Sequence, residues 1–355
     1  MQKTSMEFLR SIMAQPSPSG FEEPVQKLVR NEMESFADTV TTDVHGNVIG
    51  CINPEGKLRV MLAGHADEIG LMVNYIDDQG YLWFSTIGGW DPVVLPGQRV
   101  FIHNDGGDVF GVIGKKPIHL MESDERSKGV KVKDLWIDIG AKDKKDAEKV
   151  VAVGDHATLD AGYAELLNGI VVCRAFDDRI GAFVVLEALR MLSKKKGLKA
   201  AVYSVSTVQE EVGLRGARTS AFGIDPHVGI AVDVGFASDF PTVDKKLVGE
   251  CELGGGPLVA KGCNINPVVR RGLEDTAKKK KIPYQLNPSP KATGTDANAI
   301  QLTRAGVATG LVSVPNRYMH TPVEAVSLED VENTIKLLAE YILTLGEKSR
   351  FIPGE

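Results

Sequence analysis

The sequence has few cysteines, and they are widely spaced. The 355 residues include four: Cys51, Cys173, Cys251 and Cys263. No two of them form a Cys-x-x-Cys pair, so the pattern argues against a disulfide framework and against a zinc site built from thiolates. Scattered, reduced thiols are typical of proteins of the cytoplasm, which is the location that we expect.

Long apolar runs and basic stripes are also absent. No apolar stretch approaches the ~20 residues that cross a bilayer, and the segment 1–15 lacks the continuous apolar core of a signal peptide. The net charge is −6, and the longest lysine run, 278–281, is short. We therefore expect neither a membrane nor a nucleic acid as a partner.

The chain is long enough for two domains. Residues 1–72 and 165–355 alternate between apolar strands and amphipathic helices, which is typical of an α/β fold. Residues 73–164 instead contain short β-like runs between glycines and charged turns. These runs are 81–87, 99–103, 109–115 and 135–139. The pattern predicts a small β-rich domain, barrel, sandwich or PDZ-like, inserted into the α/β chain.

Several helices have clear start signals. Ser19 and Glu22 have the spacing of a capping box, and an amphipathic helix follows over 25–36. Ser327 is expected to cap the last helix, whose apolar residues share one face. The three histidines of the β-rich segment, at 103, 119 and 156, have no acidic residue at a useful spacing and are interpreted as surface or interface residues.

Side chains that bind metals follow five predicted strands of the α/β part, near the point where each strand ends. They are, strand by strand, His65 with Asp67, Asp177 with Asp178, Glu210 with Glu211, Asp233, and His320. Each alone is more often a capping or hydrogen-bonding residue. Open α/β sheets bind ligands outside the carboxyl ends of their strands, so five such positions along one sheet edge predict a common site.

Imidazole and carboxylate donors without a thiolate suit zinc or cobalt. A pair of such ions holds a hydroxide and polarises a carbonyl, while a further carboxylate transfers protons. The sequence therefore predicts a hydrolase with two divalent metal ions, Zn or Co, per subunit.

The motifs around these residues resemble those of the TET (tetrahedral) aminopeptidases, dinuclear metallopeptidases that include glutamyl and deblocking aminopeptidases. The motifs are GHADEIG at 64–70, AFDDR at 175–179, QEEVG at 209–213, Asp233, and YMHT at 318–321. The resemblance extends over essentially the whole chain. It implies a three-layer α/β/α exopeptidase-like catalytic domain with a mixed sheet, in which 73–164 is the dimerisation domain.

The resemblance also implies a role for each candidate ligand. His65 and Asp233 would hold one metal ion. Glu211 and His320 would hold the other, and Asp177 would bridge the two.

Two further acidic residues, Glu210 and Asp67, would have roles other than binding a metal ion. Glu210 would be the general base for the metal-bridged water, and Asp67 would orient His65. The sequence leaves open whether Asp177 or its neighbour Asp178 is the bridge. The resemblance further implies peptide substrates, from which N-terminal residues are removed, and a homododecamer built from dimers.

Three other functions compete with this interpretation. Another dinuclear metal hydrolase, a deacylase or a carboxypeptidase, would not require a free α-amine on its substrate. A glycosidase such as an endoglucanase needs two separated carboxylates and no metal. An inactive scaffold would lack activity even with added zinc or cobalt.

Overall fold

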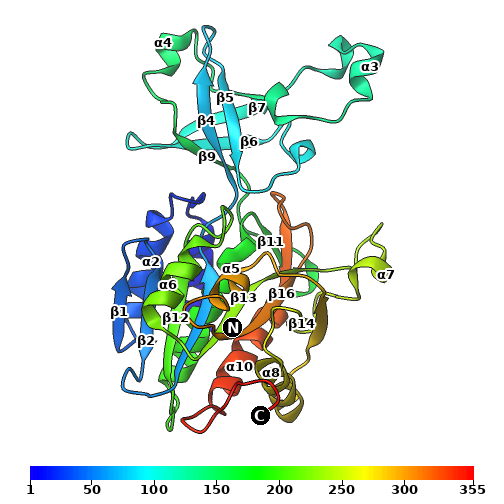
Figure 1. Cartoon of the computed structure of the whole chain (residues 1–355). Coiled ribbons are helices and arrows are strands. Elements are labelled where there is room, and N and C mark those ends of the chain that lie inside the picture. Colours follow the sequence, from blue (N-terminus) through cyan, green and yellow to red (C-terminus); the bar gives the residue numbers. More distant parts are fainter.

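The computed structural model describes residues 1–355 and has two parts (Figure 1). A large sheet with helices on both faces forms the α/β part, and a closed β-barrel stands above it in Figure 1. The chain enters the barrel after the third strand and returns to the α/β part for the remaining elements. No helix is both long enough and apolar enough to cross a bilayer.

The large sheet has eight strands in the order β1-β2-β12-β3-β13-β16-β14-β15. Their bounds are β1 (Thr39–Thr42), β2 (Val48–Ile52), β3 (Arg59–His65), β12 (Ala201–Thr207), β13 (Val228–Phe236), β14 (Leu258–Gly262), β15 (Gln285–Ser289) and β16 (Ala308–Asn316). The central strands β12, β3, β13 and β16 run parallel to one another, whereas β2 and β14 run antiparallel to their inner neighbours. The predicted mixed sheet is therefore confirmed.

Helices cover both faces of this sheet. Side chains alternate along β3: Val60 and Leu62 belong to one apolar core, and Met61 and Ala63 belong to another on the opposite face. The first core is covered by α1 (Lys3–Met13), α2 (Glu23–Glu34), α5 (Phe176–Ser193), α8 (Pro267–Lys280) and α10 (Leu328–Ile342). The second is covered by α6 (Arg215–Ile224) and α9 (Asp296–Ile300). This is the expected three-layer α/β/α arrangement.

A smaller three-stranded sheet lies beside the large one. It consists of β10 (Ala164–Glu165), β11 (Ile170–Cys173) and β17 (Glu324–Ser327), all paired antiparallel. The expectation that all five site-bearing strands share one sheet edge is wrong for β11, the strand that leads to Asp177. Its apolar run predicts a strand, but the pattern carries no information about which strand it pairs with.

The barrel contains six antiparallel strands in the closed order β4-β5-β8-β7-β6-β9. They are β4 (Gly70–Ile76), β5 (Leu82–Ile87), β6 (Arg99–His103), β7 (Val109–Gly114), β8 (Trp136–Asp138) and β9 (His156–Leu159). Inward-facing aliphatic residues such as Leu71, Val100 and Ile137 fill its core. Of the six strands, β4 and β9 at the two ends of the segment are additional to the predicted runs.

Short helical pieces decorate both parts. In the barrel they are η1 (Pro92–Val94), η2 (Ile118–Leu120), α3 (Ser123–Arg126), η3 (Val132–Asp134) and α4 (Lys144–Ala147). In the α/β part they are η4 (Leu167–Gly169) and α7 (Lys245–Val248), and Figure 1 shows α7 projecting from the body of the molecule.

Two aromatic rings meet where the barrel contacts the α/β part. Phe21, just before α2, stacks on His156 of β9 with ring centroids 3.8 Å apart. Burial and the neighbouring His103 lower the pKa of His156 to about 4. The expectation that these histidines lack acidic partners is wrong for His103, whose Nδ1 lies 2.7 Å from Asp108 Oδ1.

The two predicted serine caps do not form. Glu22, not Ser19, is the N-cap residue of α2. Ser327 does lie at the N-cap position of α10, as predicted, but its side chain makes no capping bond. Ser19 instead donates from Oγ to Asp67 Oδ2 at 2.6 Å. A helix N-terminus offers only N–H donors, whereas the carboxylate of Asp67 accepts from the Ser19 hydroxyl, and hydrogen bonds to charged groups are stronger than those between neutral groups.

Candidate metal centre

Three neighbouring parallel strands bring most of the predicted residues together. β3 ends at His65, which pairs in register with Thr207 at the end of β12. Glu210 and Glu211 follow three residues later, and Asp233 lies in β13 on the other side of β3. Because parallel neighbours end at the same sheet edge, side chains from separate strands meet there.

Asp177 comes from the first turn of α5 and lies between the two histidines. Its Oδ1 is 3.3 Å from His65 Nε2, and its Oδ2 is 3.2 Å from His320 Nε2. The carboxylate of Asp178 has other partners: its two oxygens accept hydrogen bonds from the backbone amides of His65 and Gly181. Asp177 thus presents one oxygen to each histidine, whereas both oxygens of Asp178 accept hydrogen bonds from the backbone.

The donor atoms form three overlapping groups, in each of which they lie within 4.8 Å of one another. The groups are His65 with Asp178 and Asp233, His65 with Glu210 and Glu211, and Asp177 with Glu211 and His320. The Oε1 atoms of Glu210 and Glu211 are buried and have no hydrogen-bond partner. Buried carboxylate oxygens without a partner are costly, so these atoms fit a site that binds cations.

The charges of the cluster point to the same conclusion. Burial raises the pKa of Glu210 to about 10, against the lowering effect of His65, and Asp233 raises it further. The carboxylates of Asp177 and Glu211, which face its Nε2, raise the pKa of His320 to about 11. Carboxylates outnumber imidazoles in this buried volume, and divalent cations would neutralise the excess negative charge.

Asp67 organises the side of the cluster nearest His65. Its Oδ1 lies 3.4 Å from His65 Nδ1 and accepts a hydrogen bond from the amide of Glu210 at 3.0 Å. Its Oδ2 accepts from the amide of Glu211 at 3.1 Å and from Ser19 Oγ. Asp67 thus holds the Glu210–Glu211 turn as well as His65.

His320 is held by a different set of residues. Its Nδ1 is 2.6 Å from the carbonyl oxygen of Gly89, in the loop after barrel strand β5. Its backbone amide donates to Glu324 Oε1 at 2.9 Å, and the amide of Asp177 donates to Glu324 Oε2 at 2.8 Å. His320 also has a positive φ of 59°, so this loop conformation depends on its contacts.

Sequence reasoning missed four residues around the centre. Ser19 and Glu324 support Asp67 and the ligands, and Glu22 Oε1 accepts from the amide of Gln209 at 3.0 Å. Asp296 accepts from Thr207 Oγ1 at 2.6 Å, and its other carboxylate oxygen has no partner. Their acidic or hydroxyl side chains are common at loops and caps, so no local signal distinguishes them.

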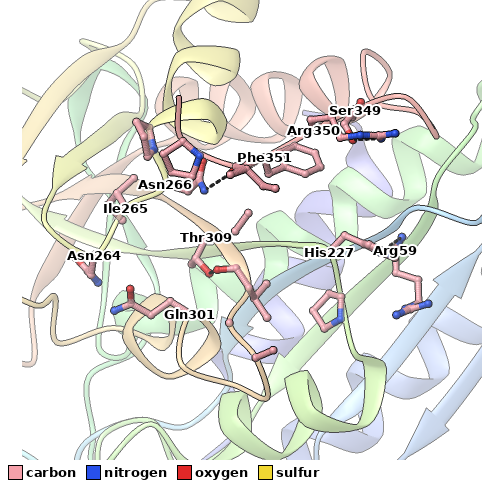
Figure 2. A pocket seen from close by; sticks show the side chains of 18 of the residues that line it. Arg59, His227, Asn264, Ile265, Asn266, Gln301, Thr309, Ser349, Arg350 and Phe351 are labelled. Carbon is pink, nitrogen blue, oxygen red and sulfur yellow. Dashed lines mark hydrogen bonds between the residues drawn. The ribbon is translucent and has the colours of Figure 1, made fainter. Parts of the chain in front are cut away.

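A large open pocket lies elsewhere, at the opposite ends of the same strands (Figure 2). It has a volume of about 850 Å³ and is lined by Arg59 at the start of β3, His227 before β13 and Phe351 of the C-terminal segment. None of the predicted site residues lines it. The pocket is therefore separate from the metal centre.

Comparison with known proteins identifies the family. Residues 46–337 match the model of the M42 glutamyl aminopeptidase family. The chain is 41% identical over 334 residues to a lysyl aminopeptidase of Pyrococcus furiosus, covering 93% of this chain and 94% of that protein.

Solved structures of related proteins resemble this chain in both sequence and fold. A TET aminopeptidase from the marine sediment archaeon Thaumarchaeota archaeon SCGC AB-539-E09 superposes with a TM-score of 0.92 at 38% identity, covering 97% of both chains. The TET1 peptidase of Pyrococcus horikoshii gives a TM-score of 0.86 at 32% identity, covering 96% of this chain and 100% of that chain. With a matching sequence, a matching fold and a cluster of carboxylates and imidazoles, the chain belongs to the M42 family and is a metallo-aminopeptidase.

Proposed function

We propose that the chain removes N-terminal residues from peptides at the cluster around Asp177, with Glu210 as the general base. The observation that carries this proposal is the position of Asp177, whose two oxygens face the Nε2 atoms of two histidines from distant parts of the chain. A carboxylate in this position would bridge two metal ions, each of which one histidine would also bind.

The proposed ligand sets draw on the groups of donor atoms, with Asp177 in place of Asp178 beside His65 and Asp233 because both oxygens of Asp178 accept backbone hydrogen bonds. His65 and Asp233 would hold one ion, Glu211 and His320 the other, and Asp177 would be shared. The absence of a thiolate among the donors favours Zn or Co bound through nitrogen and oxygen. Two such ions, when bound, supply Lewis acidity toward the scissile carbonyl and lower the pKa of the attacking water.

Glu210 would transfer the proton. Its Oε2 lies 3.7 Å from His65 Nε2, and its Oε1 has no partner within the protein. Its carboxylate would accept a proton from the attacking water and deliver it to the nitrogen of the leaving amine. Asp67 would keep Glu210 in place through the backbone amide that it binds.

The acidic surroundings also suit the substrate. The protonated α-amine of a peptide is a cation, and acidic side chains that are not proposed ligands, such as Asp296 near Glu210, lie beside the centre and would attract it. A free N-terminus would therefore bind better than a blocked one. This preference separates an aminopeptidase from a deacylase or a carboxypeptidase built on the same metals.

We also propose a homododecamer built from dimers, since the solved P. horikoshii relative is described as assembling into a tetrahedron or an octahedral shell. The inserted domain, taken as 73–164 between the catalytic segments 1–72 and 165–355, would form the dimer contact. The four cysteines are all unpaired, which supports a reducing, cytoplasmic location. Light scattering of the purified protein would give its mass in solution, and a monomer would contradict the assembly.

Peptide cleavage with defined N-termini tests the activity. Purified protein would be treated with a chelator, reloaded with Zn²⁺ or Co²⁺, and given matched peptides with free and acetylated N-termini. We expect release of the first residue from the free peptide only, loss of activity after chelation, and recovery with metal. Equal cleavage of the acetylated peptide, release from the C-terminus, or hydrolysis of a glucan would contradict the proposal.

A further inference from the structure

The inserted barrel reaches the metal centre through one short loop. β5 ends at Ile87, which pairs with Gly70 at the start of β4. Gly70 in turn lies five residues after His65. The β4–β5 hairpin therefore leaves the centre, runs through the barrel and returns beside its starting point, which places Gly88 and Gly89 against the proposed ligands.

Gly89 contacts His320 directly. Its carbonyl oxygen lies 2.6 Å from His320 Nδ1, so the ring can donate there from Nδ1 and keep Nε2 free. His320 Nε2 is the atom that faces Asp177 and Glu211, at 3.2 and 3.5 Å. A hydrogen bond from the second ring nitrogen fixes the tautomer and the orientation of a metal-binding imidazole.

Gly88 contacts the other proposed ligand of the same ion. It adopts a φ of +72°, and a Cβ at this position would lie 3.2 Å from Glu211 Oε2 and 2.6 Å from Ile69 Cγ2. A larger residue would fit only if Ile69 or the loop moved, and it would also press on Glu211. The loop is also anchored, because Trp90 Nε1 donates to the carbonyl oxygen of Gly70 at 3.0 Å.

We infer that the Gly88–Trp90 loop of the inserted barrel is part of the metal centre, where it positions His320 and Glu211 for one of the two ions. This inference rests on the proposed ligand roles of those two residues. The barrel thus has a role within its own subunit, beyond any contact between subunits. The His65 side of the centre does not depend on the loop, since Asp67 supports it.

A substitution at Gly88 tests the role of the loop, and Gly97 provides the matched control. Gly97 belongs to the same barrel and has a similar φ of +82°, but a Cβ there would meet nothing within 4 Å. Gly88→Ala and Gly97→Ala therefore impose comparable backbone strain, and only the first disturbs the centre. Binding of Co²⁺ to the metal-free proteins would be followed by calorimetry and by the visible absorption of the bound ion.

We expect Gly88→Ala to weaken one of two Co²⁺ equivalents by about 10- to 100-fold and to leave the other unchanged. Gly97→Ala should bind both equivalents like the parent. Trp90→Phe, which keeps the ring but loses the anchoring hydrogen bond, should give a smaller loss at the same equivalent. Parental binding by Gly88→Ala, or equal losses in Gly88→Ala and Gly97→Ala, would overturn the inference.

A double variant assigns the effect to a site. In a His320→Ala background only one equivalent should remain, and adding Gly88→Ala should not weaken it further. A further loss would show that the loop acts on the whole centre, and would overturn its specific role. If the parent protein binds fewer than two ions, that result contradicts the proposed two-metal function itself. Failure of that proposal is thus distinguished from failure of the inference about the loop.

Discussion

The two histidines of the centre face opposite oxygens of Asp177, but different parts of the molecule hold them. The side chain of His65 is 2% exposed and lies at the end of a central strand. The side chain of His320 is 35% exposed and lies in a loop beyond β16. Asp67, three strands and Ser19 surround the first, whereas a barrel carbonyl and Glu324 hold the second.

This difference indicates how the centre is built. A residue within a sheet is positioned by the backbone hydrogen bonds of its strand, so it needs little additional support. A loop residue with a positive φ keeps its position only through contacts made by other segments. The half of the centre around His320 should therefore be the more easily disturbed, and the half around His65 the more important for stability.

The largest expected effect comes from Glu210, which serves the chemistry of both halves. Glu210→Gln removes the proton acceptor but keeps the shape of the side chain, so we expect turnover to fall by about 10²- to 10⁴-fold. Metal content should stay at the parental level, because Glu210 is not one of the proposed ligands. Rates of peptide cleavage and elemental analysis would measure the two quantities.

Glu165→Gln is the matched control, since Glu165 is an exposed residue that pairs with Arg10. It should retain parental turnover. Turnover of Glu210→Gln close to that of the control would remove Glu210 from the mechanism.

The histidines themselves provide the most direct comparison. His65→Ala and His320→Ala should each lose one bound ion. In the metal-free protein, His65→Ala leaves buried carboxylates without their partner and should lower the free energy of unfolding by about 3 kcal/mol or more. His320→Ala also leaves the buried carboxylates of Asp177 and Glu211 without a partner, but the ring that it removes is 35% exposed, so water can reach the space, and we expect a smaller loss of about 1 to 3 kcal/mol.

Urea denaturation of the two metal-free variants would measure this difference. Equal destabilisation would contradict the view that the two halves are held differently. Loss of neither ion would contradict the ligand assignment itself.

Ser19 offers a milder change on the His65 side. Ser19→Ala removes the 2.6 Å hydrogen bond to Asp67, which then holds the Glu210–Glu211 turn less firmly. We expect metal affinity to fall about tenfold for the ion near His65 and by less for the other ion, because Asp67 also holds the backbone amide of the other ion's proposed ligand Glu211. Ser127→Ala, which removes an exposed hydrogen bond in the barrel, should have no effect on metal binding. A loss confined to the other ion would reverse the proposed division.

The smallest effect concerns the contact between the barrel and the α/β part. The pKa of His156 is about 4 in the folded protein, below the ordinary value of 6.5. Between these values the unfolded chain binds the additional proton, so this residue makes stability fall as the pH decreases from about 6.5 to 4. The facing groups His103, Asp155 and Asp108 influence the same titration.

His156→Phe keeps an aromatic ring on Phe21 and removes the titration, so its stability should depend less steeply on pH within this range. His119→Gln, in an exposed turn, should keep the parental dependence. Denaturation midpoints measured from pH 4 to pH 7 would compare the three proteins. Identical slopes for His156→Phe and the parent would show that this ring does not sense the pH.

The sequence by itself determined the strands of the sheet and the donors that follow them. The runs that became β3, β12, β13 and β16 are apolar and rich in β-branched residues, and such runs are stable where both faces of a strand are covered. His65, Glu210, Glu211 and Asp233 come at or near the ends of these runs, so their convergence follows once the strands are parallel neighbours. The inserted β segment was readable in part, since its short runs and glycine turns predicted β5, β6, β7 and β8 but not β4 or β9.

Only the tertiary structure decided which strands pair and which side chains contact each other. A residue pattern specifies the period of an element but not the distant segment that it contacts, so the pairing of β11 with β17 could not be read from the chain. The same limit applies to Ser19, whose motif predicts a helix cap although its hydroxyl binds Asp67. The contact of His320 with Gly89 depends on a backbone carbonyl, which every residue carries, and only the folded path of the β4–β5 hairpin brings it to the metal centre.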